Sequence, residues 1–321
     1  ITGSDGRVRL PPDGRFLRKA SDPEDFIRGV DFRPDPGWIG PVRDMGPRRQ
    51  TDDLGVMIEL PPPLPYWKEP VQYQTAGDFT IELPEGRWRV AVDHGMEYVP
   101  VVAEIALRGE RARTLPIALR RWINLPERGW WSGDAHVHHP TMERSQREFL
   151  LRYARATDVH VVSVLGMGHH LGTDFKQRGF GRKFRVREGN TWLVSGQEEP
   201  RSENGHVVGL NIDHLFRDPN ALSFFDLAFQ GIHAQQGALV GFAHFAWNGY
   251  GTLRGFPWYV TTGLIDYVEI LQFNRMNAQG YHDYLDLGFR LTAAAGSDVP
   301  WGATMGEVRT YGQVIGHVAN A

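Results

Sequence analysis

Two histidines stand two positions apart in the segment Gly-Asp-Ala-His-Val-His at 133–138, which ends an apolar, aromatic run that begins at Trp130. In an extended strand, residues i and i+2 face the same side, so the rings of His136 and His138 can reach one metal ion. A single pair of this kind is weak evidence for a metal site. It gains weight because four later strand-like runs are each flanked by a residue of a metal-binding type. These residues are Glu198, His206, His244 and Asp298.

Nitrogen and oxygen donors of this kind suit zinc, manganese or iron, and we expect one or two such divalent ions. An ion with an open coordination position lowers the pKa of a bound water toward about 7 and polarises the carbonyl or phosphoryl oxygen under attack. The residues therefore predict a hydrolase that uses metal-bound hydroxide. Glu199 is the alternative to Glu198 as a ligand. For any one histidine, a hydrogen-bonded core position is the alternative to a ligand role.

The elements that must position these residues can be read from the hydrophobic pattern after Trp130. Strand-like and helix-like segments alternate there, which is typical of a parallel sheet or barrel. Strands are predicted over 131–137, 159–165, 191–196, 207–212, 238–243, 267–271 and 291–295, and helices over 141–156, 224–236 and 277–287. In such a barrel the chemistry collects at the carboxyl ends of the strands. Most of the candidate ligands lie at such ends, whereas His206 stands at the start of its strand.

The chain before residue 128 differs in composition from the rest. Residues 1–70 are rich in Pro, Gly, Asp and Arg, which predicts an irregular leader. Residues 71–127 contain short alternating runs at 79–83, 88–92, 101–107 and 114–119, which predict a small antiparallel β-sandwich. The barrel is expected over 128–321.

The motifs of the barrel region resemble, in order and spacing, those of the polymerase and histidinol phosphatase (PHP) family of metallohydrolases, and in particular its carbaryl-hydrolase-like (CehA/McbA) branch. They are GDAHVH at 133–138, SGQE at 195–198, GHVVGL at 205–210, FAH at 242–244 and GSD at 296–298. This resemblance implies a distorted (β/α)7 barrel that holds one to three divalent ions and follows a small β-domain.

The resemblance also implies how the ligands are shared. One ion would be bound by His136, His138, Glu198 and Asp298, and Glu198 would bridge to a second ion held by His206 and His244.

Two positions depart from the family pattern. The family's second strand usually ends in Thr-Asp-His, whereas this chain has Gly-Met-Gly-His-His at 166–170, and Asp298 is followed by Val-Pro where relatives have x-His. Those positions help to hold the third ion, so a full cluster of three ions is not expected. The alternative is that His169 or His170 supplies a substitute ligand, against the interpretation of both as polar loop residues. An inactive barrel that serves as a carbohydrate-binding or scaffolding module is the alternative from another class of protein.

Further residues near the expected mouth could act on the substrate. Asp134 is a candidate hydrogen-bond partner for a histidine ring, and His139 and His169 are candidates for the general acid. Aromatic side chains after His244 could stack on an aryl group or a sugar ring, or pack against the β-domain, and arginines could hold a phosphate or carboxylate. The substrate-binding candidates are Arg201, Trp247, Tyr250, Arg254, Trp258 and Trp301.

Composition narrows the function further. A formal net charge of −3 gives no broad basic field for nucleic acid, and no run approaches the roughly 20 apolar residues of a membrane span. A chain without cysteine that opens with Ile1 fits a soluble protein, with export after processing slightly favoured over the cytoplasm. We expect hydrolysis of an ester, carbamate or amide in a small aromatic or sugar-bearing substrate, with a phosphoester as the alternative. The oligomeric state stays open.

Overall fold

The computed structural model describes residues 77–109, 112–169, 172–245, 254–272, 275–299 and 305–314, with only the backbone of His169 and Arg275. Before residue 77 it describes the backbone of five short strands. These are β1 (Thr2–Gly3), β2 (Phe16–Arg18), β3 (Arg49–Thr51), β4 (Met57–Glu59) and β5 (Val71–Tyr73). β2 pairs with β5 and β3 pairs with β4, both antiparallel. Most of the predicted leader at 1–70 lies outside the described residues.

A small sheet precedes the barrel. β6 (Gly86–Val92) pairs antiparallel with β8 (Val101–Leu107), and β1 joins the other edge of β6. β7 (Tyr98–Val99) pairs with β9 (Arg120–Arg121). The predicted strands 79–83 and 114–119 are wrong, because neither segment is extended in a ladder. Alternation is a local signal that does not select a pairing partner, and the predicted sandwich is left without two of its four strands.

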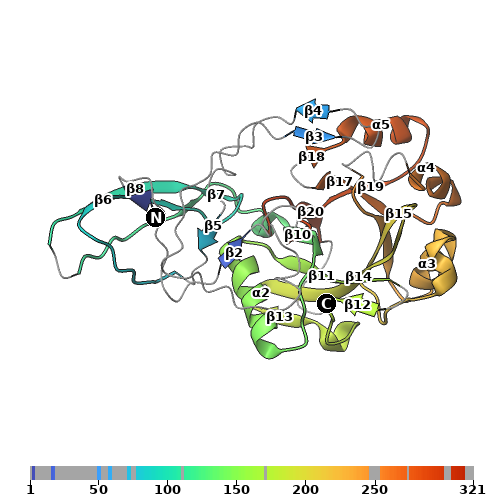
Figure 1. The fold of residues 1–321 in the computed structure, drawn as a ribbon, viewed down its shortest axis with the longest axis horizontal. Coiled ribbons are helices and arrows are strands. Elements are labelled where there is room, and N and C mark those ends of the chain that lie inside the picture. Colours follow the sequence, from blue (N-terminus) through green and yellow to red (C-terminus); the bar gives the residue numbers. More distant parts are fainter. Residues whose placement is uncertain are drawn as a thin grey trace.

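Seven strands form the main sheet, and they correspond to the seven predicted after Trp130. In spatial order they are β10 (Trp130–Val137), β11 (Val161–His169), β14 (Thr191–Ser202), β15 (Gly205–Leu210), β16 (Leu239–Phe242), β17 (Tyr267–Gln272) and β19 (Thr292–Ala295). A bridge between Val137 and Val299 returns the last strand to the first, so the sheet is nearly closed into a barrel. Figure 1 shows this curved sheet, with the β6–β8 sheet extending away from it.

Four short strands extend the edges of the main sheet. β12 (Gly172–Asp174) pairs with β11, β13 (Val186–Glu188) with β14, β18 (Arg275–Met276) with β17, and β20 (Thr310–Gln313) with β10. All four are antiparallel to their partners.

The direction of β15 corrects the prediction of a parallel sheet. β10, β11 and β14 are parallel to one another, but β15 is antiparallel to both β14 and β16. β14 ends at Ser202 and β15 begins at Gly205, and a connection of this length can close a hairpin but cannot cross over to a parallel strand. The start of β15 therefore lies beside the end of β14. This places His206, which seemed misplaced at a strand start, at the same end of the sheet as the other candidate ligands.

Helices α2 (Arg144–Ala156), α3 (Phe225–His233) and α5 (Ala278–Asp286) are those that the sequence predicted, and each begins later than expected. A short helix α4 (Phe256–Tyr259) precedes β17. Short 3-10 helices are η2 (Pro126–Arg128), η3 (Arg182–Phe184), η4 (Pro219–Leu222) and η5 (Val260–Thr262). In the described residues no α-helix separates β11 from β14, or β14 from β15, so the fold is a mixed α/β barrel without a helix after every strand.

The core has an outer and an inner part. Leu150 and Tyr153 of α2 pack on β10 and β11, and Phe225 and Phe229 of α3 pack on the other half of the sheet. Inside the barrel, a small cluster around Leu165 fills the space between strands. Among the described residues, no helix is both long and apolar enough to cross a membrane.

A partly buried ion-pair network connects the segment before the barrel with the barrel itself. Arg121 Nη1 lies 2.6 Å from Glu97 Oε2, and Arg121 Nη2 lies 2.9 Å and 3.0 Å from the two carboxylate oxygens of Asp158. Glu97 is 1% exposed, and its Oε2 also accepts from the backbone N–H of Leu125 at 3.0 Å. Because a buried charge is costly unless it is paired, this contact holds β9 against the turn that precedes β11.

Candidate metal centre

The structure brings the six predicted ligands together at one end of the barrel. They come from five separate strand ends, which explains why residues up to 162 positions apart in the sequence meet. His136 is in β10 and His138 follows it, Glu198 is in β14, His206 is in β15, His244 follows β16, and Asp298 follows β19.

The first group of donor atoms surrounds the two histidines of the 133–138 motif. His136 Nε2 lies 3.0 Å from His138 Nε2. Glu198 places Oε1 3.6 Å from His136 Nε2 and Oε2 3.3 Å from His138 Nε2. Asp298 Oδ1 lies 3.5 Å and 3.4 Å from the same two nitrogens. All four side chains are buried, so the donors face one another and not bulk water.

The second group shares Glu198 with the first. Glu198 Oε1 lies 2.8 Å from His206 Nδ1 and 3.2 Å from His244 Nε2, and these two nitrogens are 2.9 Å apart. The donor atoms of His136, His138 and Glu198 fall within 4.8 Å of one another, and so do those of Glu198, His206 and His244, which is a span that one ion can bridge. His206 is the most exposed member, so the cluster opens toward solvent on the β15 side.

The hydrogen bonds behind the rings decide which nitrogens face the cluster. His136 Nδ1 lies 3.0 Å from Glu269 Oε2, His138 Nδ1 lies 3.2 Å from the carbonyl of Leu165, and His244 Nδ1 lies 2.8 Å from Gln272 Oε1. Each of these partners is an acceptor, which assigns the ring proton to Nδ1.

The Nε2 lone pairs of the three rings then point into the cluster. Unprotonated nitrogens and carboxylate oxygens at these separations repel one another unless a positive charge lies between them. The donor set therefore fits a divalent ion.

The charges of the cluster show that it favours a positive charge, either a bound cation or, without one, an added proton on a ring. Burial lowers the pKa of His136, but the charges of Glu269, Asp298 and Glu198 outweigh burial and leave it well above its ordinary value. Burial raises the pKa of Glu198, but His206 and His136 outweigh burial and leave it well below its ordinary value. Asp298 is affected in the same way, mainly by His136. Both carboxylates are thus held in the ionised form that binds a cation.

Two of the clustered residues have an unusual backbone conformation. His244 has a φ of 59° and Asp298 a φ of 53°, in the left-handed region that side chains other than glycine rarely adopt. The Asp298 N–H donates to the carbonyl of His136 at 2.8 Å, which helps to hold this conformation. Strained positions of this kind concentrate at functional sites, because the surrounding structure must compensate for them.

Asp134 contacts the backbone of the site and not a histidine ring. Its Oδ1 accepts from the N–H groups of Ser297 at 2.9 Å and His136 at 3.2 Å, and its Oδ2 accepts from Gly306 at 3.2 Å. Burial raises the pKa of Asp134 to about 6, although these hydrogen bonds oppose that rise. Asp134 therefore fixes the loop that carries Asp298, and the predicted role as partner of a ring falls instead to Glu269.

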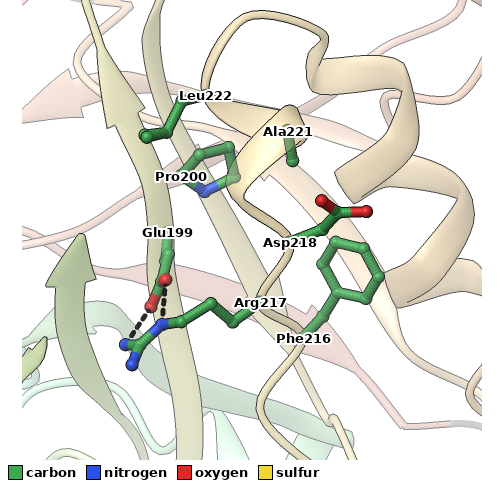
Figure 2. A pocket seen from close by; sticks show the side chains of 7 residues that line it. All are labelled: Glu199, Pro200, Phe216, Arg217, Asp218, Ala221 and Leu222. Carbon is green, nitrogen blue, oxygen red and sulfur yellow. Dashed lines mark hydrogen bonds and ion pairs between the residues drawn. The ribbon is translucent and has the colours of Figure 1, made fainter. Parts of the chain in front are cut away.

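The two adjacent glutamates of β14 have different partners. Glu199 receives hydrogen bonds from Arg217, at 2.5 Å from Nε and 2.8 Å from Nη2, on the side of the strand shown in Figure 2. Arg217 Nη2 also donates to the Thr173 hydroxyl oxygen at 2.6 Å, so the ion pair of Glu199 and Arg217 connects β14 with β12. Consecutive strand residues face opposite sides, which explains why Glu198 and not Glu199 reaches the histidines.

The predicted general acids are less well placed. His139 Nδ1 lies 2.7 Å from the carbonyl of Pro140, and the ring stacks on Phe149 of α2 at a centroid distance of 5.3 Å. This position gives no support to a role of His139 at the leaving group. The side chain of His169 lies outside the described residues.

Arg201 is the substrate-binding candidate that lies at the cluster. Its Nε is 3.3 Å from Glu198 Oε2, and Arg201 is the direct cross-strand neighbour of His206. Arg254 instead pairs with Glu203 at 3.2 Å, and Trp258 is 75% exposed on α4. The remaining candidates, Trp247, Tyr250 and Trp301, lie outside the described residues.

Sequence reasoning missed Glu269 and Gln272, which contact the rings of His136 and His244. Both are fully buried in β17. The sequence did contain a signal for Glu269. A glutamate in the middle of the apolar run 267–271 means either that the segment is not a buried strand or that the charge is buried against a partner.

No family model matches this chain, and no curated protein matches it. Several solved structures are similar at low identity, among them the following two. One is a two-domain protein from Bacteroides vulgatus that contains a predicted PHP-like metal-dependent phosphoesterase, with 15% identity, a TM-score of 0.37, and coverage of 53% of this chain and 52% of that chain. The other is PsfC from Pseudomonas syringae, with 16% identity, a TM-score of 0.39, and coverage of 60% and 86%. The chain thus spans about half the length of the first. At these TM-scores the assignment of the site rests on the chain's own side chains.

Proposed function

We propose that the protein is a metal-dependent hydrolase whose ions are held by the six clustered residues. The observation that carries this proposal is the convergence of three buried Nε2 lone pairs on two ionised carboxylates, Glu198 and Asp298. The likeness of five sequence motifs to the PHP family supports it. One ion would be held by His136, His138, Glu198 and Asp298, and a second by Glu198, His206 and His244.

A divalent ion at such a site supplies a Lewis acid and lowers the pKa of water at its open position. The protein's own groups do the rest. Glu198 would supply a carboxylate oxygen to both positions, and Asp134 fixes the loop that presents Asp298. Among the described ligands His206 is the most exposed, so we expect substrate to approach from its side.

The first candidate bond is that of an ester, carbamate or amide in an aromatic or sugar-bearing small molecule. A phosphoester is the second candidate, and one observation favours it. Arg201 places a guanidinium at the open side of the cluster, next to His206 and 3.3 Å from Glu198. Guanidinium groups bind phosphoryl oxygens in a bidentate manner, and such binding helps an anionic substrate more than a neutral one.

Metal content tests the proposal directly. Protein purified without added metal should contain one or two tightly bound divalent ions per chain by elemental analysis, and the double change His136→Ala with His138→Ala should remove them together with any hydrolytic activity. The matched control is His214→Ala with His282→Ala, because both residues are exposed histidines outside the cluster. Full metal retention in the first variant would defeat the enzyme assignment.

A substrate panel separates the candidate bonds. Aryl esters, carbamates, amides, phosphoesters and aryl glycosides should be tested with and without a chelator, and chelator-sensitive turnover identifies the class. A protein that binds metal and turns over none of these compounds would instead fit an inactive barrel that binds carbohydrate or serves as a scaffold.

A further inference from the structure

β17 carries two polar side chains in the middle of the barrel. Glu269 and Gln272 are both 0% exposed. A buried carboxylate or amide costs several kcal/mol unless it finds partners, so the identity of those partners indicates what each side chain is for. In both cases the partner is a ring nitrogen of a proposed metal ligand.

A bulge in β17 lets both side chains reach the cluster. Residues three apart in a regular strand face opposite sides of the sheet. The pairing of β17 with β19 shifts register between Glu269 and Leu271. A shift of this kind re-aims the following side chain, and bulges are frequent next to active sites. Gln272 therefore points toward the same end of the barrel as Glu269.

Glu269 contacts the ring of His136, which belongs to the first group of donors. Its carboxylate oxygens lie 3.1 Å and 3.0 Å from His136 Nδ1. This contact fixes the proton on Nδ1 and directs Nε2 toward Glu198 and Asp298.

Gln272 contacts one histidine from each group. Its Oε1 accepts from the backbone N–H of His244 at 3.0 Å and from His244 Nδ1 at 2.8 Å. Its Nε2 lies 3.2 Å from His136 Nδ1. The amide thus fixes both the backbone and the ring of His244, whose φ is positive, and it packs against the ring of His136. Because His136 Nδ1 donates its proton to Glu269, the Gln272 amide N–H forms no hydrogen bond with that nitrogen, and Gln272 sets the orientation of His244 alone.

We propose that Gln272 is a positioning residue that holds the ring and backbone of His244 at the second cation position, as Glu269 holds the ring of His136 at the first. This inference rests on the proposed function. Removal of the amide should weaken binding at the position of His206 and His244 by roughly 10–100-fold, which is the usual effect of losing a partner behind a ligand. The two ions should then bind in two separate steps.

The test compares Gln272→Met with Glu269→Gln by calorimetric titration of metal-free protein with Mn²⁺, and uses Co²⁺ absorption to report the coordination of each ion. Gln272→Met keeps the side-chain volume but loses the amide, and it should weaken the binding step at His206 and His244. Glu269→Gln should weaken the step at His136 and His138 and leave the other within a few-fold. If Gln272→Met folds and binds both ions as tightly as the wild type, the positioning role of Gln272 is wrong.

A second measurement needs no variant. In wild-type protein with ¹⁵N-labelled histidine, the ring nitrogen shifts of His136 and His244 should report a proton on Nδ1 in the metal-bound protein. A proton on Nε2 of His244 would overturn the inference even if Gln272→Met does not fold. A wild-type protein that binds no divalent ion would defeat the proposed function itself. A protein that binds two ions with unaltered behaviour in Gln272→Met would defeat only the positioning role of Gln272.

Discussion

Glu198 Oε1 lies 2.8 Å from His206 Nδ1, and Glu198 Oε2 lies 3.3 Å from His138 Nε2. One carboxylate therefore faces both groups of nitrogen donors. The two residues therefore differ in their effect on metal binding. A change at Glu198 affects both ion positions, whereas a change at His206 affects only one.

This asymmetry predicts a hierarchy of metal content. Glu198→Gln replaces the shared carboxylate by a neutral amide and should remove both ions, because each position loses an anionic ligand. His206→Ala should remove only one, since the position at His136 and His138 keeps its ligands. Elemental analysis after dialysis measures the difference. Glu199→Gln, which changes the partner of Arg217, is the neighbouring control and should keep the wild-type content.

The position of Arg201 predicts a charge-dependent effect on turnover. Arg201→Met should lower kcat/KM for an aryl phosphoester by about 10–100-fold, because a charge-assisted hydrogen bond contributes roughly 1.5–3 kcal/mol. A neutral aryl ester should change by no more than about threefold. Arg144→Met, at an exposed arginine of α2, is the control. Equal losses on both substrates would show that Arg201 does not recognise charge.

The lowered pKa of the buried His160 predicts that the protein becomes less stable at acid pH. Burial lowers the pKa of His160, whose Nδ1 lies 2.8 Å from the Ser132 hydroxyl. Below about pH 6.5 the unfolded chain gains a proton that the folded chain does not bind, so this contribution to stability is complete above that pH and is lost below it. His160→Asn cannot titrate and should lose less unfolding free energy between about pH 7.5 and about pH 5 than the wild type, measured by denaturant unfolding. His282→Asn, at an exposed position, should behave like the wild type.

The ion pair of Arg121 with the buried Glu97 predicts a cost in stability with a partial rescue. Arg121→Met leaves Glu97 buried without its cation and should lower the unfolding free energy by about 3–5 kcal/mol. The double change of Arg121→Met with Glu97→Gln removes the uncompensated charge and should recover part of that loss. Denaturant unfolding of the two single variants and the double variant gives the coupling energy, and strictly additive losses would speak against a direct interaction.

The sequence was sufficient to predict the strands that carry the site and the residues that meet there. The seven strands after Trp130 were recognisable because each is a short apolar run with a polar residue at its end, and α2 was recognisable from the spacing of Phe149, Leu150 and Tyr153. Pairing was not predictable in the same way. Strands 79–83 and 114–119 had the right alternation without a partner, and the direction of β15 depends on a short connection and not on any periodicity. Glu269 was hidden because its partner, His136, lies 133 residues away in the sequence.

The reversed direction of β15 also determines where the chain tolerates changes in length. Elsewhere in the barrel a helix separates many of the strands, so an extra residue in a connection can be absorbed at the surface. Between β14 and β15, only Glu203 and Asn204 separate Ser202 from Gly205. A one-residue insertion there that shifted the ladder would turn His206 to the opposite face of the sheet while every ligand residue was still present in the sequence. The spacing of eight residues from Glu198 to His206 is therefore as much a part of the site as the two side chains themselves.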